Sequence, residues 1–246
     1  MKLKFLAPAL LAGLVAFTSC SKDDSKKEEP KKENNQGGGN QQGGNQQGGN
    51  QQGEQKPATD KITLDFSGTE AKEQQLSALT GWTYFSLKNG VVTPENPAED
   101  LSWDIAFKQY FVKLNGGTSG KGKAEAFKTE EKDFAKVTEA PKTGFVKDKE
   151  EKFTDREGKE VSRDNVSPLL TGGFFSKTGM IEINPANIKK YGDKNVFGTN
   201  EWVYIIKTAD GTYAKIQLTD IYKEILGKKV PFFLNLKYQL SKTVSE

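Results

Sequence analysis

The chain has 246 residues, of which 34% are hydrophobic and 28% are charged, and its formal net charge is +3. It contains no His and a single Cys, which excludes His-based general base catalysis, Cys–His and Ser–His nucleophiles, and nearly all zinc and copper sites. Residues 21–59 hold no aromatic residue and no Leu, Ile or Val, whereas residues 60–242 hold all but two of the 15 Phe. The later segment is long enough for one sizeable core. Composition therefore favours a binding or structural protein over an enzyme.

Residues 1–19 read as a lipoprotein signal peptide. Lys2 and Lys4 precede an apolar run from 5 to 17, which is too short to span a bilayer but typical of a signal-peptide core. Small residues then precede Cys20, the pattern that a lipoprotein signal peptidase cleaves. We expect lipid attachment at Cys20, which would anchor the protein firmly. The alternative is an ordinary secretory peptide with an incidental Cys.

The first mature residues predict where the protein is displayed. The acidic pair Asp23-Asp24 comes directly after Cys20 and resembles a surface-export signal of lipoproteins in one Gram-negative lineage. We therefore expect a lipid-anchored protein on the outer membrane that faces the cell exterior. Removal of the signal takes away Lys2 and Lys4 and leaves a net charge of about +1, which gives no electrostatic case for nucleic-acid binding.

Residues 20–59 are predicted to be a disordered tether. The first part is rich in Lys, Glu, Asp and Ser, and residues 36–53 repeat Gln-Gln-Gly-Gly-Asn. Such a segment cannot bury enough apolar surface to offset the entropy of ordering. For about 40 residues the root-mean-square span is roughly 35 Å. We interpret this segment as a spacer that holds a folded module away from the membrane.

Residues 60–242 are predicted to form a single all-β, antiparallel domain. Alternating and β-branched or aromatic patterns indicate strands, and Asn89-Gly90 is a strong turn signal. Ala209-Asp210-Gly211 reads as the turn of a hairpin. The expected strands, in chain order, cover residues 62–66, 82–87, 103–112, 201–207, 212–218 and 232–240.

The remaining segments of this domain give weaker patterns. Residues 70–80 and 219–226 are each predicted as a short helix. Residues 128–168 are rich in Lys, Glu and Asp, with widely spaced apolar residues, which predicts surface hairpins or long loops. The motif at 117–124 nearly fits a phosphate-binding loop, but Ala124 replaces the hydroxyl residue and the context is antiparallel. We interpret that motif as a Gly-rich connection between two strands.

Three sequence blocks resemble the HmuY-like haem-binding surface lipoproteins. They are W-T-Y-F-S at 82–86, D-L-S-W-D-I-A-F at 100–107 and N-G-G-T-S-G-K-G-K at 115–123, with a further match at 209–220. The resemblance covers the whole folded part and the lipoprotein signal. It implies an all-β fold, surface attachment, and capture of haem for delivery to an outer-membrane, TonB-dependent receptor.

The resemblance also makes the haem ligands the main question. The founding type of the family holds iron between two His, and this chain has none. The corresponding positions fall near Lys159 and near Asn184 or Pro185. Other members use Met, and Met180 is the only Met left after signal removal. The remaining options are Met180 with Tyr191 or Lys159, or Met180 alone, since Tyr ligates haem in other proteins. The alternatives are a core or pocket-wall role for Met180 and a surface role for Tyr191.

The sequence thus predicts a non-catalytic surface lipoprotein that binds haem or a related tetrapyrrole without His ligation. The expected site lies at 155–195, where an apolar slot and nearby cations would hold a flat ligand with carboxylates. The alternative is a binding module of the same fold for a peptide, a glycan or a partner receptor. The residues expected to form the slot and its cations are Phe174, Phe175, Met180, Lys177, Lys189 and Lys190.

Overall fold

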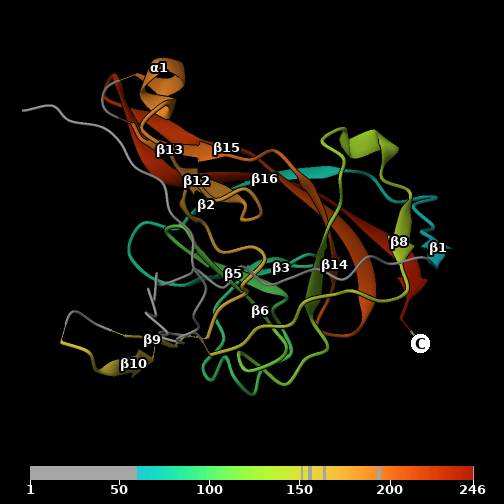
Figure 1. The fold of residues 1–246 in the computed structure, drawn as a ribbon. Coiled ribbons are helices and arrows are strands. Elements are labelled where there is room, and N and C mark those ends of the chain that lie inside the picture. Colours follow the sequence, from blue (N-terminus) through green and yellow to red (C-terminus); the bar gives the residue numbers. More distant parts are fainter. Residues whose placement is uncertain (1–59, 151, 155–156, 163–164, 193–194, 246) are drawn as a thin grey trace, which may run out of the picture. The chain divides into compact units, whose positions relative to one another are not determined.

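The computed structural model describes residues 60–150, 152–154, 157–162, 165–192 and 195–245 (Figure 1). The predicted signal peptide, Cys20 and the tether lie outside the described residues. In the described part the chain is built almost entirely from antiparallel strands, which confirms the all-β prediction. Its helical elements are the five-residue α1 (Asn187–Tyr191) and the 3-10 turn η1 (Phe134–Lys136), neither of which could cross a membrane.

A five-stranded sheet with the order β2-β16-β15-β14-β7 forms the centre of the domain. Its middle is the long hairpin of β15 and β16, and the final strand alternates between buried and half-buried residues from 232 to 239, as predicted. The strand bounds are β2 (Lys72–Ser77), β7 (Glu125–Lys128), β14 (Val203–Lys207), β15 (Thr212–Ile225) and β16 (Lys228–Val244).

A four-stranded sheet packs against one face of this sheet. Its order is β4-β3-β5-β6, and its strands are β3 (Thr83–Ser86), β4 (Gly90–Val92), β5 (Ile105–Lys108) and β6 (Phe111–Leu114). Fully buried side chains from both sheets form the main core between them. They include Phe85, Ile105, Phe107 and Leu114 from the four-stranded sheet, and Leu76, Ile206, Ile216, Leu234 and Leu236 from the five-stranded sheet.

The other face of the five-stranded sheet is covered by β1 (Lys61–Thr63), β8 (Glu139–Pro141) and η1. A second apolar cluster fills this layer, and its buried members are Leu64, Phe134, Val137, Ala140, Val203, Ile205 and Tyr213. The amine of Lys215 is buried in the same layer and donates to the carbonyls of Phe134 and Val137 at 3.0 and 3.1 Å. The central sheet is therefore packed on both faces.

The two predicted short helices are wrong, because both segments are strands. Residues 72–77 form the edge strand β2, whose backbone pairs with β16 from Ser77 to Lys72. Residues 219–225 continue β15 through register shifts after Leu218 and Asp220. These irregularities place Leu218, Ile221 and Tyr222 in the core, a spacing that imitates a helical period although the backbone is extended.

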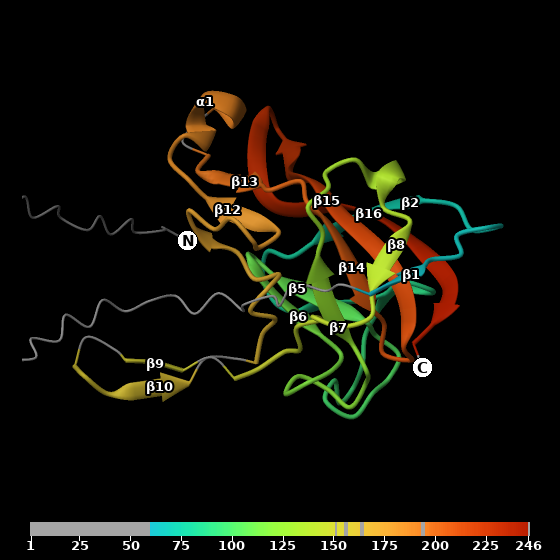
Figure 2. The same ribbon diagram turned by 45° about the vertical axis from the view of Figure 1, so that its right-hand side comes forward.

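A smaller three-stranded sheet and a surface hairpin complete the domain. The sheet has the order β11-β12-β13, in which β11 (Gly173–Phe174) runs parallel to β12 (Ile181–Ile183), and β13 (Phe197–Thr199) antiparallel. The hairpin of β9 (Lys152–Thr154) and β10 (Glu160–Ser162) confirms the surface hairpin expected in the charged middle section. Figure 2 shows α1 next to β13 and the far end of the β15–β16 hairpin.

Candidate ligand-binding site

Two adjacent aromatic rings are exposed at the end of β11 and at the start of the loop that follows it. Phe174 is 70% exposed and Phe175 is 63% exposed, and Phe175 has a positive φ of 52°. Lys177 lies two residues further on and is also exposed. Exposed aromatic rings and a strained backbone are both unfavourable in isolation, and their coincidence makes this loop a candidate site. We call residues 174–177 the aromatic segment.

Buried hydrogen bonds fix the loop that carries the aromatic segment. Asn200 Nδ2 donates to the carbonyl oxygens of Ser176 and Gly179 at 2.9 and 2.6 Å. Ser176 Oγ accepts from the Gly179 N–H at 3.0 Å, and the Phe175 N–H donates to the Ile183 carbonyl at 3.0 Å. The two exposed rings therefore project from a well-supported backbone, which lowers the entropy lost when they contact a ligand.

Met180 lies in the main hydrophobic core. It directly precedes β12, and its side chain is only 1% exposed. Its N–H donates to the Leu170 carbonyl at 2.9 Å, and its own carbonyl accepts from the Asn200 N–H at 3.2 Å. The thioether would reach a ligand only if this part of the core opened.

Tyr191 lies at the end of α1 and is half-buried. Its ring contacts that of Tyr222 with a centroid distance of 4.9 Å, and the amines of Lys190 and Lys229 lie 5.0 and 5.7 Å from its centroid. Lys189 and Lys190 are both exposed, and Lys190 pairs with Glu201 at 3.2 Å. β12 pairs with β11, which carries Phe174, and α1 with Tyr191 follows β12 along the chain.

Lys159 is exposed in the turn between β9 and β10. Figures 1 and 2 both show this hairpin well separated from α1. The structure thus places the sequence-predicted residues on four different features: the aromatic segment, the core with Met180, α1 with Tyr191, and the β9–β10 hairpin with Lys159. It does not bring Met180, Tyr191 and Lys159 to one point.

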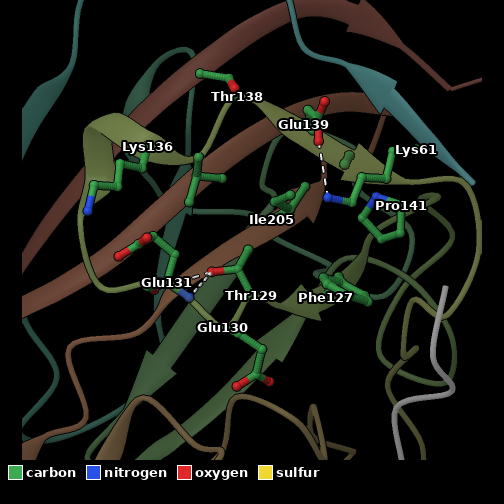
Figure 3. A pocket seen from close by; sticks show the side chains of 12 residues that line it. Lys61, Phe127, Thr129, Glu130, Glu131, Lys136, Thr138, Glu139, Pro141 and Ile205 are labelled. Carbon is green, nitrogen blue, oxygen red and sulfur yellow. Dashed lines mark hydrogen bonds and ion pairs between the residues drawn. The ribbon is translucent and has the colours of Figure 1, made fainter. Parts of the chain in front are cut away.

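A groove of about 410 Å³ lies elsewhere, between β8 and the neighbouring ends of β7 and β14 (Figure 3). Phe127 and Ile205 contribute apolar surface, and an exposed ion pair joins Lys61 to Glu139 at 3.1 Å. The charged residues that line it are Lys61, Lys136, Glu130, Glu131 and Glu139. This excess of carboxylates disfavours a ligand that carries carboxylates itself. None of the sequence-predicted residues lines this groove.

The blocks that carry the sequence resemblance build a buried polar scaffold. Asp104 is buried, and its two carboxylate oxygens accept from the N–H groups of Leu87 and Ala209 at 2.8 and 2.9 Å. Burial raises the pKa of Asp104, although these two N–H donors act in the opposite direction. One side chain thereby connects the end of β3, the start of β5 and the hairpin turn at 209–211.

Asn115 holds the Gly-rich connection between β6 and β7. Its Nδ2 donates to the carbonyls of Asp100 and Trp103 at 2.7 and 2.8 Å, and its Oδ1 accepts from the Gly122 N–H at 3.2 Å. A Cβ at Gly120 would lie 2.1 Å from Oδ1 of Asn115, so glycine is needed there. The motif at 117–124 is therefore a connection between two strands, as predicted, and it packs against the side chain of Asn115.

Asp148 is a second buried carboxylate next to this connection, and sequence analysis did not identify it. Its Oδ2 accepts from the Leu114 N–H and the Ser119 hydroxyl, both at 2.7 Å. Its Oδ1 is buried without a hydrogen-bond partner among the described residues. Burial raises the pKa of Asp148 to about 7. A single Asp in a charged stretch of sequence carries no signal for this role.

The described part of the chain is an all-β protein in which Asp104 and Asn115, from the sequence blocks that carry the resemblance, have structural roles. Residues 78–238 match the HmuY protein family, so this chain belongs to the HmuY family, whose members are binding proteins. No curated protein matches the chain.

Several solved structures are similar to this chain at low sequence identity. The apo HmuY analogue of Tannerella forsythia is 20% identical, with a TM-score of 0.48, over 76% of this chain and 100% of that one. A protein of Bacteroides vulgatus named as HmuY-like and haem-binding is 19% identical, with a TM-score of 0.44, over 71% and 96%. A Bacteroides fragilis protein named as a lipoprotein is 17% identical, with a TM-score of 0.45, over 72% and 93%.

Proposed function

We propose that this protein is a surface lipoprotein that binds haem or a related tetrapyrrole for uptake, with the aromatic segment as the contact surface. The observation that carries the proposal is the exposure of Phe174 and Phe175 on a loop that Asn200 holds through two hydrogen bonds. Aromatic faces stack on flat apolar ligands, and the adjacent Lys177 can pair with a propionate. Membership of the HmuY family supports the same role.

The three candidate iron ligands are ranked by the structural change that each would need in order to reach a bound haem. Coordination by Met180 requires the core next to Leu170 to open, whereas Tyr191 is already half-buried near the surface. Lys159 would need the β9–β10 hairpin to move toward α1. We therefore place Tyr191 first, Met180 second and Lys159 third. A phenolate favours ferric iron, and a thioether favours ferrous iron.

Titration of the purified mature protein with hemin, with and without dithionite, tests this proposal. We expect a saturable Soret shift in the parent and a loss of about tenfold or more in affinity in Phe174→Ser/Phe175→Ser, because two stacking rings are removed. Tyr191→Phe should lose the ferric spectrum if the phenolate is the ligand, and Met180→Ala should lose the ferrous spectrum if the thioether is.

The matched control is Leu101→Ser, which removes a 60% exposed apolar side chain outside the aromatic segment. It should bind like the parent. If the parent gives no saturable Soret change in either redox state, haem is not the ligand. The same exposed aromatic segment would then favour the second candidate function, a binding surface for a non-haem ligand or a partner receptor.

We propose delivery of the ligand to an outer-membrane, TonB-dependent receptor.

The anchor is proposed to be an acylated Cys20 on the outer membrane, followed by the tether to residue 59 and the folded domain to residue 242. Cys20→Ala should remove incorporation of a fatty-acid analogue in growing cells, because the thiol and the new amino terminus are the acceptors. The parent and a Ser21→Ala variant should both remain labelled. Equal labelling of Cys20→Ala and the parent would contradict lipid attachment at this residue.

A further inference from the structure

The turn at the end of the β15–β16 hairpin carries an unusual residue. The two residues between the strands are Leu226 and Gly227, with φ angles of 51° and 73°. Turns with two positive φ angles favour Asn-Gly, because branched side chains are strained in this conformation. Leu226 is also 98% exposed. One residue thus has an unfavourable backbone and an unfavourable solvent contact, a combination that indicates a role in binding.

Further apolar side chains lie close to this turn. Ile225 is the last residue of β15 and is partly exposed, and Ile188 on α1 is exposed to a similar degree. The ring contact between Tyr191 and Tyr222 places α1 beside the same end of the hairpin, as both ribbon views show. We call residues 223–229 together with α1 the hairpin tip.

Lysines surround the apolar residues of the hairpin tip. Ile225 pairs directly with Lys228, and Glu224 pairs with Lys229 in the strand register. The lysines of the tip are Lys189, Lys190, Lys223, Lys228 and Lys229, and all five are exposed. Among the described residues, the carboxylates next to them are Glu224, within the hairpin, and Glu201, which pairs with Lys190. The hairpin tip is therefore apolar at its end and predominantly cationic around it.

We propose that the hairpin tip docks on an anionic lipid surface, with Leu226 in the boundary between headgroups and acyl chains. Lysines around an apolar point match the lipid phosphates, and their long stems can follow the apolar surface while the amines stay at the headgroups. A lipid surface fits better than a folded partner, because a stable protein interface takes about 20–30 residues on each side, whereas the hairpin tip consists of residues 223–229 and the five residues of α1. The contact would act beside the proposed acyl anchor and orient the domain.

Vesicle sedimentation of the mature chain with Cys20→Ala tests the proposal without the acyl anchor. We expect binding to vesicles of phosphatidylethanolamine and phosphatidylglycerol, and at least tenfold weaker binding to phosphatidylcholine vesicles. Leu226→Asn should weaken binding to the anionic vesicles about fivefold, since the apolar contact is lost. Asn suits a positive φ better than Leu, so this variant should unfold at the same or a higher temperature. Lys228→Gln/Lys229→Gln should weaken binding about tenfold at low salt.

Matched controls are Val91→Asn, which alters another exposed apolar residue, and Lys72→Gln/Lys142→Gln, which removes two exposed lysines elsewhere. Both should bind the anionic vesicles like the parent. Equal binding by Leu226→Asn and the parent, equal binding to both vesicle types, or no binding at all would each overturn the proposal. A self-association of the parent that Leu226→Asn abolishes would also overturn it, because the occupant would then be a second copy.

Discussion

Replacement of Asp104 by Asn is expected to lower the free energy of unfolding by about 2–4 kcal/mol, although the two side chains have nearly the same shape. The carboxylate accepts one backbone N–H on each oxygen, from Leu87 and Ala209. An amide offers a single acceptor oxygen, and its NH₂ group would face the other N–H. A buried backbone donor without a partner costs about 1–3 kcal/mol, and the opposed donors add to this. Urea denaturation at pH 7 measures the difference.

The matched control for this prediction is Asp100→Asn. The Asp100 side chain accepts from the nearby Ser102 N–H at 2.7 Å, and the amide oxygen of Asn can replace that acceptor. We expect a change below about 1 kcal/mol for this exposed hydrogen bond. A loss in Asp104→Asn no larger than the loss in Asp100→Asn would mean that Asp104 does not hold the two segments together.

The same replacement at Asp148 should have the opposite effect at alkaline pH. The folded state holds the Asp148 proton up to a pKa of about 7, whereas the unfolded chain releases it near the ordinary aspartate pKa of 3.8. Between these values the unfolded state binds fewer protons, so the contribution of Asp148 to the free energy of unfolding falls as pH rises and levels off above pH 7. The pKa difference corresponds to roughly 4 kcal/mol at most. Asp148→Asn removes this fall.

We therefore expect Asp148→Asn to unfold with a free energy close to that of the parent near pH 4, and to be more stable than the parent by up to roughly 4 kcal/mol at pH 8. The amide oxygen can still accept from Leu114 and Ser119, and the NH₂ group takes the place of the oxygen that lacks a partner. Denaturation of both proteins across this pH range tests the prediction, with Asp60→Asn as an exposed control. A difference that does not grow with pH would show that Asp148 is ionised in the folded protein throughout.

The sequence predicted the final strand β16 because its side chains alternate between buried and half-buried positions, and Leu234 and Leu236 are both fully buried on one face of it. It predicted β14 and β15 from their β-branched and aromatic runs. The single strand expected at 103–112 is wrong, because the chain turns there and forms the antiparallel pair β5 and β6. The helix predicted at 219–226 was wrong, because irregular pairing in β15 gives its apolar residues a spacing that resembles a helical period. The helix predicted at 70–80 was wrong because β2 is an edge strand with mostly polar side chains, and its conformation depends on pairing with a strand far along the chain.

The candidate site was harder to predict than the fold. Residue type alone led to the prediction that Phe174 and Phe175 line a slot, and the structure shows both rings exposed on a loop that Asn200 holds by hydrogen bonds. The blocks with the most specific sequence pattern contain Asp104 and Asn115, and these residues satisfy backbone groups in the interior. The most specific sequence blocks therefore contain residues that support the fold, whereas the residues proposed to contact the ligand carry no such local pattern.

The pairing of β2 with β16 has a consequence for the biogenesis of the protein. It joins positions about 160 residues apart, such as Gln75 and Asn235, and the last strand also bonds to Asp65 near the beginning of the domain. A chain that is still emerging from the ribosome cannot complete its central sheet until its final residues are available, and sheets with such distant partners form slowly. The proposed amino-terminal export signal would thus have time to act while the domain is still unfolded and able to thread through a narrow translocation channel.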